Sequence, residues 1–431
     1  MPSFAHILLA VAAATGLVSA AAAQDLPPPP ATQAIPAQTP PAPAPAVALP
    51  TDPGDAAAYA TAFGVSVAAA RQRLDTLAAL VAPIAALRVA YRDRLAGIAL
   101  DHSPALGVRV LLTGPTPVSD SVIVAAGSSV PVTFATGAGA TLEQLRAALA
   151  NSQADLRAAL TSPPGIGIDQ RTGELVIIVG KGDLIPEGGE LLTARLRDIA
   201  GVPLRIRSID VPGVDLAAEG GSRLIGTNPL DGKRYVCTAG FVVTDGTRTA
   251  IATAAHCPDT IAYIDADRRE WPLAFVGQWG WGYQDVQINA SDIPLSPLFF
   301  ADTARSVSRS VTGQRGVVQT TTGDFVCHRG ERTGYSCALV ELTDFAPAGD
   351  LCGGACTPSW ITVAGPHCGA GDSGAPVFID TTGFGIVKGG SYRSDGRCAF
   401  YFYMSVDYLP AGWRLLTVSP PAMLAPPAAV E

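Results

Sequence analysis

The sequence predicts an all-β domain in the second half of the chain and an α+β region of two small repeated units in the first half. The chain contains 45 glycines and 36 prolines but only 15% charged residues, as β-rich exported proteins with many turns do. Helical apolar periodicity is found in the first half. The eight cysteines all lie between Cys237 and Cys398, so only the second half is predicted to carry disulfides.

The length and charge of the chain limit its domain number and its partners. With 431 residues it exceeds one typical domain, so we expect two or more folded units. The formal net charge of −8 argues against a nucleic acid or an anionic membrane surface as the partner.

Residues 1–23 are typical of a secretory signal peptide. An apolar run from Ile7 to Val18 leads to Ala21-Ala22-Ala23, and we expect cleavage before Gln24. This run is short for a spanning helix, and no later segment reaches the roughly eighteen uncharged apolar residues that one needs. We therefore expect export, either by secretion or into a periplasm.

Two low-complexity segments flank the folded part. Residues 24–53 are a proline- and alanine-rich tract, which favours polyproline II structure and has no core to bury. We expect a semi-stiff linker there; a ligand for a proline-recognition domain is the alternative. Residues 418–431 include Ser419-Pro-Pro and are expected to form a disordered tail.

The region 54–213 opens with a predicted helix. Ser66 is a plausible N-cap, because its hydroxyl can accept a hydrogen bond from a free backbone N–H of the first turn. Apolar residues then recur at helical spacing on one face. They are Val67, Ala70, Leu74, Leu77 and Leu80.

An internal repeat follows the helix. Each copy begins with a hairpin of alternating apolar residues around a turn that contains glycine or proline, over 97–112 and over 165–179. A strand at 130–134 and a helix opened by Thr141 and Gln144, a capping-box pattern, follow the first hairpin. The second hairpin is followed by a helix and a strand, predicted at 190–200 and 204–209.

The run Gly371-Asp372-Ser373-Gly374 is the first candidate for chemistry. It sets one hydroxyl among small residues, which suits a loop whose backbone N–H groups face a bound carbonyl. Acyl transfer needs such donors, because negative charge develops on the substrate oxygen. Taken alone, the same four residues also suit an ordinary turn.

Two upstream residues could activate this serine. His256 follows a predicted strand (250–254) that would hold its imidazole rigidly, and Asp285 precedes alternating apolar residues typical of a buried strand. Serine is a weak nucleophile that needs an adjacent base, and the base needs an orienting acid. A lone histidine beside a cysteine is usually structural, and a lone aspartate at a strand edge is usually a cap. Together with Ser373, the two residues favour an active site.

Residues from about 220 to 415 resemble the bacterial chymotrypsin-like serine endopeptidases of the alpha-lytic protease and streptogrisin group. The order His256, Asp285, Ser373 is that of chymotrypsin-like enzymes, and differs from subtilisins and α/β-hydrolases. The motifs that carry the resemblance are Cys237…Gly240-Phe241, Thr253-Ala-Ala-His-Cys257, Asp285, Cys327…Thr333-Gly334-Tyr335…Cys337, Gly371-Asp-Ser-Gly374 and Gly389-Gly390-Ser391.

The resemblance implies the fold and the activity of residues 214–417. The fold would be an all-β double antiparallel β-barrel, two six-stranded barrels packed face to face. The activity would be that of a serine-type endopeptidase on polypeptide substrates, monomeric and without cofactor or metal. His256 would be the base and Asp285 its orienting acid, and the N–H groups of Gly371 and Ser373 would form the oxyanion hole.

The resemblance also implies the disulfide pairing, which the sequence alone leaves open among about a hundred connectivities. The implied pairs are Cys237–Cys257, Cys327–Cys337 and Cys368–Cys398, which leaves Cys352 with Cys356. Zinc held by Cys352, Cys356, His367 and Cys368 is the alternative. It is disfavoured because Cys368 is already paired and an oxidising compartment favours disulfides.

The first half resembles the pro region of the same protease group, over roughly residues 57 to 212. Such a region assists folding of the protease and then blocks it until it is cut away. The absence of cysteines fits a part that is discarded; an accessory domain that stays attached is the alternative. The junction lies in 211–221. Self-cleavage after Leu216, Ala217 or Ala218 would indicate a preference for small or aliphatic residues.

The substrate pocket is only partly predicted. Its walls are expected to include Gly369, Ala370, Lys388, Gly389, Gly390, Ser391, Phe402 and Tyr403. No acidic residue stands where it could bind the side chain of lysine or arginine, so cleavage after basic residues is disfavoured. Trp279, Trp281 and Tyr283 could line an extended groove, although aromatic residues in small barrels more often serve core or rim packing.

Three positions depart from the pattern of the group. Lys388 stands where the group usually has a serine that touches the catalytic aspartate; its charge could stabilise Asp285, but we expect it to point to solvent. Cys368 is followed by one residue fewer before Gly371 than in the alpha-lytic type, so we expect an altered pocket rim.

The third departure is His328, which stands where alpha-lytic protease has an arginine that pairs with a buried aspartate, here Asp372. If His328 takes that role, its imidazole must be charged, and the pairing should fail at alkaline pH. Arg329 is the alternative partner.

Two other functions use the same residues. One is an exported binding module that keeps the protease fold without turnover. The presence of all three triad residues disfavours this alternative. The other is an esterase on the same scaffold, since the acyl chemistry is shared.

Overall fold

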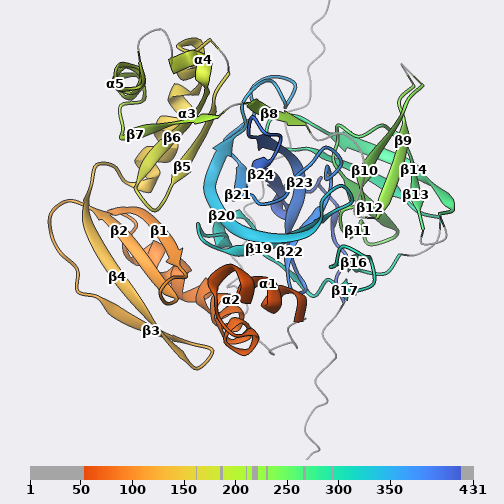
Figure 1. Cartoon of the computed structure of the whole chain (residues 1–431), viewed down its shortest axis with the longest axis horizontal. Coiled ribbons are helices and arrows are strands. Elements are labelled where there is room, and N and C mark those ends of the chain that lie inside the picture. Colours follow the sequence, from red (N-terminus) through yellow and green to blue (C-terminus); the bar gives the residue numbers. More distant parts are fainter. Residues whose placement is uncertain are drawn as a thin grey trace, which may run out of the picture. The chain divides into compact units, whose positions relative to one another are not determined.

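The computed structural model describes residues 53–161, 163–184, 188–209, 211–215, 222–229, 232–265, 268–292 and 295–418. The described residues all belong to one compact unit (Figure 1). The predicted signal peptide, nearly all of the predicted linker, the junction at 216–221 and the tail after Val418 lie outside the described residues. Among the described residues, no helix is both long and apolar enough to cross a membrane. The predicted limits 54–213 and 214–417 stay predictions.

Two helices open the described chain, α1 (Pro53–Phe63) and α2 (Val67–Ala90). Ser66 caps α2 as predicted, since its hydroxyl accepts a hydrogen bond from the N–H of Ala69. The predicted apolar stripe is buried from Ala70 onwards, whereas Val67, the first residue of the helix, is 41% exposed.

A four-stranded sheet follows, with the strand order β1-β2-β4-β3. Its hairpin β1/β2 is antiparallel, and β4 runs parallel to β2. The strands are β1 (Leu95–Asp101), β2 (Gly107–Thr113), β3 (Ser121–Ala125) and β4 (Ser128–Ala138).

The second repeated unit contains a hairpin and a parallel third strand as well. Strand β6 is antiparallel to β5 and parallel to β7. The elements are α3 (Leu142–Ala158), β5 (Gly165–Asp169), β6 (Glu174–Gly180), α4 (Lys181–Leu184), α5 (Gly189–Ala200) and β7 (Leu204–Ile209). The predicted repeat, a hairpin with a further strand, is thus present, and the structure adds that this third strand is parallel to the second in both units.

Helix α3 connects the two repeated units. It begins after Thr141 with the predicted capping box, and it contacts β1 of the first unit as well as β5 and β6 of the second. Its buried leucines, Leu145 and Leu149 among them, share a core with Ile166 and Leu196 of the second unit. The sequence could place the start of the helix, because caps are local, but not the core that its buried face joins.

The C-terminal domain (residues 222–418) is all-β and has two main sheets. The first has the order β10-β9-β13-β14-β15-β12-β11-β25. Its strands are β9 (Arg223–Thr227), β10 (Arg234–Thr238), β11 (Val242–Thr244), β12 (Thr249–Thr253), β13 (Thr260–Ile264), β14 (Glu270–Trp279), β15 (Val286–Ala290) and β25 (Arg414–Leu415). In the described residues, the end strands β10 and β25 do not pair, so this sheet curls without the closure expected of a six-stranded barrel.

The second sheet closes into a barrel, because the path β19-β22-β23-β24-β21-β20 returns through the pairing of β20 with β19. Its strands are β19 (Phe325–Gly330), β20 (Gly334–Ala346), β21 (Trp360–Ala364), β22 (Pro376–Ile379), β23 (Thr382–Tyr392) and β24 (Cys398–Ser405). Shorter elements are β16 (Leu298–Phe300), β17 (Ser308–Ser310), β18 (Gly313–Gln314), η1 (Val317–Gln319) and η2 (Val406–Tyr408). The predicted fold class, a chymotrypsin-like double barrel preceded by an α+β region, is confirmed.

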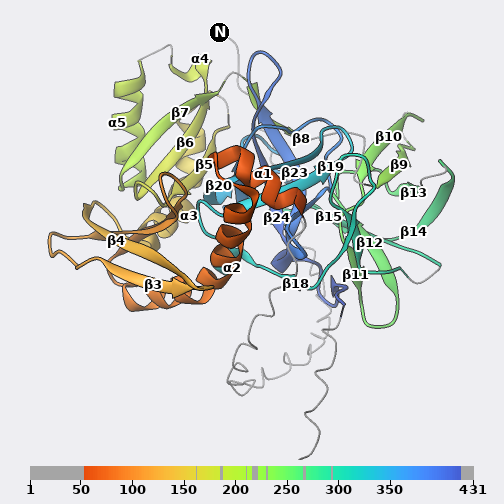
Figure 2. The same ribbon diagram turned by 60° about the horizontal axis from the view of Figure 1, so that its bottom comes forward.

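Backbone pairing joins the first half of the chain to this barrel (Figure 2). Strand β5 pairs with β20, with Ile168 opposite Thr343. Strand β8 (Val211–Asp215) pairs with β23, a different strand of the same barrel. The sheet of the second repeated unit is therefore a continuation of the barrel wall.

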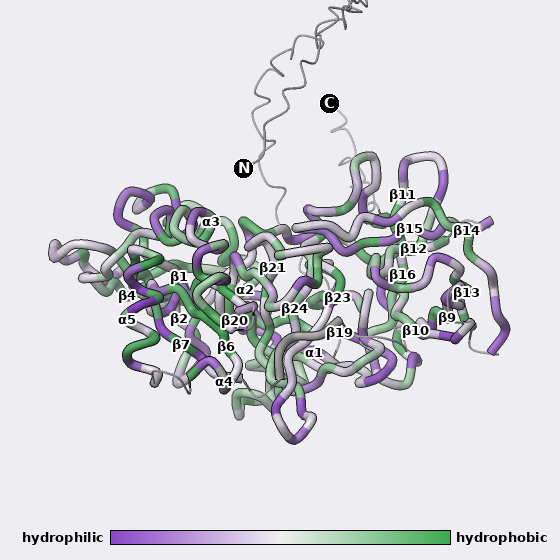
Figure 3. The backbone as a smooth tube through the Cα atoms, turned by 90° about the horizontal axis from the view of Figure 1, so that it is seen from above, coloured by the Kyte–Doolittle hydropathy of each residue, from purple (hydrophilic) through white to green (hydrophobic). Residues whose placement is uncertain are grey.

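Apolar side chains and four disulfides hold the domain together. Hydrophobic stretches gather around β20 and β6, whereas many of the peripheral turns are hydrophilic (Figure 3). The disulfides connect Cys237 with Cys257, Cys327 with Cys337, Cys352 with Cys356 and Cys368 with Cys398, the four predicted pairs. Since these sulfurs are bonded to each other, the zinc alternative has no thiolate to use.

Candidate active site

Three loops at strand ends bring the predicted catalytic residues together. His256 stands three residues after β12, and Asp285 immediately precedes β15, which pairs with β12. Ser373 comes from the other sheet, three residues before β22. Pairing of β12 with β15 therefore sets the imidazole beside the carboxylate, and the contact between the two sheets adds the hydroxyl.

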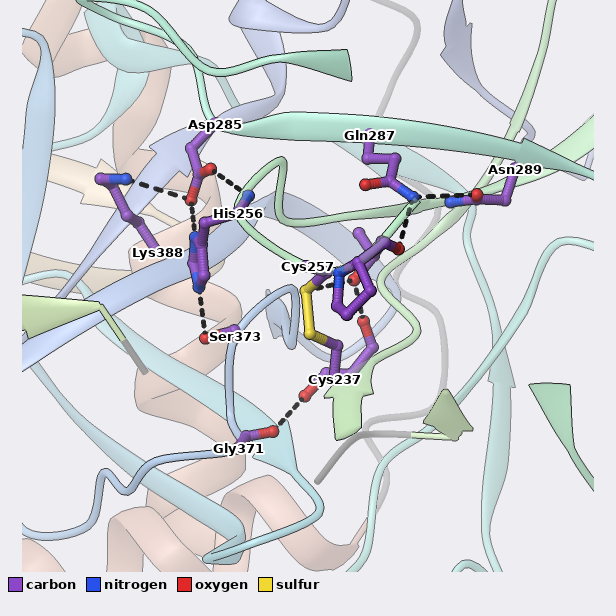
Figure 4. The surroundings of a disulfide bond; sticks show 12 residues. Cys237, His256, Cys257, Asp285, Gln287, Asn289, Gly371, Ser373 and Lys388 are labelled. Atoms are coloured by element: carbon purple, nitrogen blue, oxygen red, sulfur yellow. Dashed lines mark hydrogen bonds and ion pairs between the residues drawn. A yellow bond between two sulfur atoms is a disulfide. The ribbon is translucent and has the colours of Figure 1, made fainter. Parts of the chain in front are cut away.

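The three side chains form an unbroken hydrogen-bonded line (Figure 4). His256 Nδ1 lies 2.9 Å from Asp285 Oδ2, and His256 Nε2 lies 2.8 Å from Ser373 Oγ. The backbone N–H of His256 also donates to Asp285 Oδ1 at 3.2 Å. This geometry allows a proton to pass from the serine to an imidazole whose other nitrogen is held by the carboxylate.

Asp285 is held in its charged form although it is buried. Burial raises the pKa of the carboxyl group, but the charges of His256 and Lys388 and two hydrogen bonds from His256 outweigh it and lower the pKa to about 2. Its backbone N–H points at the sulfur of Met404, 3.3 Å away. A carboxylate that stays ionised at all ordinary pH values can stabilise an imidazolium beside it.

Lys388 does not point to solvent, as the sequence led us to expect. Its side chain is 1% exposed, and Nζ lies 3.4 Å from Asp285 Oδ2 and 5.5 Å from the ring centre of Trp360. Because β23 runs through the barrel wall, position 388 faces inwards, and the long stem brings Nζ to the carboxylate oxygen that also binds His256 (Figure 4). Lys388 belongs to the charge network of the triad rather than to a pocket wall.

Thr238, the last residue of β10, holds the serine loop in place, although no sequence motif singled it out. Its N–H donates to the carbonyl of Ser373 at 2.7 Å, and its hydroxyl donates to the carbonyl of Gly371 at 3.0 Å. Gly374 has φ +85°, and a Cβ there would collide with the Thr253 hydroxyl and the Thr238 carbonyl. Only glycine therefore fits after the serine.

The predicted oxyanion donors are the N–H groups of Gly371 and Ser373. Gly371 has φ +123°, which glycine adopts without strain. Across the described parts of the chain, neither N–H group donates a hydrogen bond to a protein acceptor. Both are thus available to a substrate oxygen, as an oxyanion hole requires.

The buried Asp372 does not need His328 as a charged partner, so this expectation is wrong. His328 is fully buried, which lowers its pKa, and its Nε2 stands 4.0 Å from Asp372 Oδ2. The carboxylate instead accepts bonds from the Thr333 hydroxyl at 2.7 Å and from the N–H groups of Gly369, Arg332 and Thr333. A neutral imidazole suffices beside a carboxylate that has four donors.

Arg329 does not replace His328. Its guanidinium group donates to the carbonyls of Asp302 and Thr303 and to the carboxylate of Glu331. The alternative partner is therefore wrong as well, and the backbone of the 332–333 turn supplies what the arginine of alpha-lytic protease was expected to supply.

The predicted pocket residues divide into two groups. Gly389 and Gly390 lie on β23 and pair with β8, which makes them accessible to a backbone that adds to the sheet. Phe402 and Tyr403 are fully buried neighbours on β24, so their side chains point to opposite faces. Phe402 packs on Trp360 in the barrel core, and Tyr403 belongs to another buried cluster, so the two cannot form one wall.

The remaining pocket candidates lie in the serine loop and on β23. Gly369 and Ala370 precede the oxyanion donors, and Ser391 follows the paired glycines on β23. A Cβ on Gly369 would meet the stem of Arg332 at 2.8 Å, so this wall is already tightly packed.

The aromatic residues before Asp285 are exposed and close to a disulfide loop. Trp281 is 70% exposed and Tyr283 47% exposed. The N–H of Gly282 donates to the carbonyl of Cys352, and the N–H of Thr357 donates to the carbonyl of Gly282. The short Cys352–Cys356 loop therefore braces the segment that carries both rings, which favours the groove interpretation for Trp281 and Tyr283.

A cavity of about 640 Å³ lies away from the triad, at the eight-stranded sheet of the C-terminal domain. Its lining is mostly apolar and includes Ile251, Leu273 and Phe299, and no triad residue takes part. Acyl transfer needs the nucleophile and its base, so the cavity is not the catalytic centre.

The fold of the C-terminal domain and the arrangement of His256, Asp285 and Ser373 are those expected of a chymotrypsin-like serine protease. Comparison with known proteins points the same way. No family model matches the chain. Streptogrisin-C of Streptomyces griseus is 24% identical over 169 residues, which cover 38% of this chain and 35% of that protein. The chain thus spans about a third of the length of the curated relative that it matches.

Two solved structures are similar as well. Protease A of Thermobifida fusca is 23% identical, with a TM-score of 0.36, over 46% of this chain and 98% of that chain. The Nocardiopsis protease NAPase is 20% identical, with a TM-score of 0.36, over 48% and 99% of the two chains. The chain is similar to bacterial chymotrypsin-like serine proteases of the alpha-lytic protease and streptogrisin group, as its motifs predicted.

Proposed function

We propose that the chain is the precursor of an exported serine endopeptidase that hydrolyses peptide bonds through an acyl-enzyme, with a preference for small or aliphatic residues before the cut. The observation that carries this proposal is the continuous line of hydrogen bonds from Asp285 through His256 to Ser373, at 2.9 and 2.8 Å. A structural histidine would not need both partners in this order.

Each triad residue has a distinct role in the reaction. His256 takes the proton of Ser373 as Oγ attacks the peptide carbonyl, and Asp285 stabilises the imidazolium that forms. The N–H groups of Gly371 and Ser373 bind the oxyanion. His256 then gives the proton to the leaving amine. In the second half of the reaction, water attacks the acyl-enzyme with His256 as its base, and the proton returns to Ser373 as the acid product leaves. These steps require no cofactor.

The first half of the chain is proposed to be a pro region that blocks the active site. Its strand β8 pairs with β23 in the manner of an added substrate strand, with Val214 opposite Gly390 and Asp215 opposite Gly389. In this antiparallel register the chain runs towards Lys388, whose Nζ touches Asp285. Ser373 is 0% exposed in this arrangement, which supports a blocked precursor.

The three candidate cut sites, after Leu216, Ala217 or Ala218, directly follow β8 in the sequence. We propose that the chain cuts itself after one of these residues. Each of them agrees with the proposed preference for small or aliphatic residues.

The pro region is also proposed to assist folding. Strand β20, which closes the barrel, is held along its length by the first half: β5 extends it, and Arg146 and Arg207 bind Asp344 and Glu341 at 3.1 and 2.9 Å. Closing a barrel joins strands far apart in sequence, which is slow because loop closure costs entropy. A partner that holds one strand in place reduces this cost.

Export is supported by the signal-like residues 1–23 and by the four disulfides, which persist in oxidising compartments. The mature enzyme would act on polypeptides as a monomer, outside the cytoplasm.

One experiment tests activity, cut site and preference together. The full chain and a Ser373→Ala variant are produced in parallel, followed by gel electrophoresis, amino-terminal sequencing and labelling with a serine-directed organophosphonate. We expect trimming and labelling of the parent alone, with a new amino terminus at Ala217, Ala218 or Glu219. A label without peptide turnover would favour the esterase, and no label would favour the binding module.

A further inference from the structure

A second charged site joins the two halves of the chain, away from the triad. The carboxylate of Asp55, in the first turn of α1, is 0% exposed and is surrounded by donors of the C-terminal domain. Arg309 binds both of its oxygens, at 2.8 and 3.0 Å. The N–H of Asp380 donates at 2.7 Å, and the hydroxyl of Tyr335 donates to Oδ1.

The donors are held in place by the C-terminal domain itself. Arg309 lies on β17 with its side chain 5% exposed, donates to the carbonyl of Asp380 at 3.1 Å, and stacks over the ring of Phe378 at 5.5 Å. A planar guanidinium fixed in this way matches a carboxylate with two parallel bonds. Contacts within the C-terminal domain thus fix the orientation of the guanidinium group that binds Asp55.

Apolar contacts surround the ion pair. Tyr59, one helical turn after Asp55, packs edge-on against Phe325 at 5.1 Å, and its hydroxyl bonds with His102 at 2.7 Å. His102 in turn lies 2.7 Å from the carbonyl of Gly323. One face of α1 thus carries both an anion and an aromatic ring into the barrel side.

The site lies at the other end of a strand from the catalytic serine. Ser373 precedes β22 and Asp380 follows it. No residue of the triad contacts Asp55 in the described chain, so the two sites are chemically independent.

We propose that Arg309, Tyr335 and the amide of Asp380 form a carboxylate-binding site of the protease, and that its ligand is Asp55 of the pro region. This inference rests on the proposed function, in which residues 54–213 are a pro region. A buried charge that loses its partner is strongly destabilising, so Asp55 and Arg309 require each other. The site then serves as the anchor by which α1 docks on the barrel.

The test uses the full-length chain with Ser373→Ala, which stays uncut. Asp55→Ala is expected to lower the ratio of folded to unfolded chain by roughly a hundredfold or more in urea titrations. Arg309→Met is expected to lower it similarly, and the double variant to be little worse than either single one. Asp93→Ala, at an aspartate whose side chain is 93% exposed, is the matched control and is expected to change nothing.

Chemical rescue separates a carboxylate site from a general packing defect. Formate, added to the Asp55→Ala chain, is expected to recover much of the lost stability, whereas chloride at the same ionic strength recovers none. Formate is expected to leave the Arg309→Met chain unchanged. Equal recovery by chloride, recovery of Arg309→Met, or additive effects in the double variant would overturn the proposal.

If the Asp55→Ala chain does not fold even with formate, Asp55→Asn and Tyr335→Phe take its place, and an unchanged urea midpoint in both overturns the inference. A further readout uses the Asp55→Asn chain with its serine intact. Because Asp55 leaves with the pro region, we expect fewer active sites by organophosphonate titration but the same kcat/KM per active site. A parent without any label refutes the proposed function, while the rescue result still decides the carboxylate site.

Discussion

The Nζ atom of Lys388 lies 3.4 Å from Oδ2 of Asp285, on the same oxygen that binds His256. The triad of this protein is therefore a line of four charged or polar groups, with a buried cation at its inner end. A cation beside the carboxylate reduces the stabilisation that the carboxylate can give to the imidazolium of His256.

This competition predicts the pH dependence of catalysis. In Lys388→Met, a substitution of similar length, the imidazolium of His256 should be more stable, so the acidic limb of the kcat/KM profile should move to higher pH by about one unit. Lys388→Ser, which restores the residue usual in the resembled group, should move it in the same direction. An acidic limb that stays in place in both variants would show that Lys388 acts only through packing.

The low pKa of Asp285 predicts how the domain responds to acid. The folded value of about 2 lies below the ordinary 3.8, so the charged carboxylate contributes stability that is present above pH 3.8 and lost as the pH falls towards 2. Thermal unfolding of the Ser373→Ala chain should show this loss between pH 4 and 2. Asp285→Asn should lack this part of the pH dependence and, with the serine intact, should reduce kcat by about 10⁴. An identical acid profile in both chains would contradict the assignment.

At the site where Asp55 binds, the raised pKa of Asp380 predicts that stability depends on pH in the opposite sense to the dependence caused by Asp285. Burial and then the charge of Asp55 raise its pKa to about 7, against the opposing charge of Arg309 and with a smaller contribution from Asp75. Because the folded value is raised, stability is greatest below pH 3.8 and declines as the pH rises towards 7. Asp380→Asn should therefore raise the melting temperature of the uncut chain at pH 8 and change it little at pH 3.

Asn is a fair replacement there, since Asp380 has φ +50°, which asparagine tolerates. Asp93→Asn provides the exposed control. A gain of equal size at both pH values would indicate a conformational effect rather than the removal of a charge.

Thr333 rather than His328 is predicted to support the serine loop. Thr333→Val removes a hydrogen bond of 2.7 Å to the buried carboxylate of Asp372. Bonds to charged groups contribute about 1.5–3 kcal/mol, so we expect a loss of that order in urea unfolding. His328→Asn should leave the alkaline limb of kcat/KM unchanged. Alkaline inactivation in the parent that disappears in this variant would restore the charged-histidine interpretation.

Much of the site could be predicted because its signals are local. A serine between glycines, a histidine after a strand and an aspartate before one are readable along the chain, and so is the Thr141–Gln144 capping box. Periodicity showed the two hairpins with equal clarity. The disulfide pairs followed only from the resemblance.

Side-chain direction and long-range packing could not be predicted in this way. The direction of Lys388 depends on which face of β23 turns inwards, and Thr238 gains its role only because the two sheets bring it against the serine loop. No motif in the sequence singled out Asp55, an acidic residue in the first turn of a helix. Its partner stands 254 residues further along the chain.

The sequence by itself determined which side chains are the candidates for nucleophile, base and acid, and where helices and hairpins begin. Tertiary structure alone decided which buried charges meet. Burial of a charged side chain is tolerated only where an opposite charge or several hydrogen-bond donors compensate it. Strands distant in sequence supply these partners, Lys388 for Asp285 and Arg309 for Asp55.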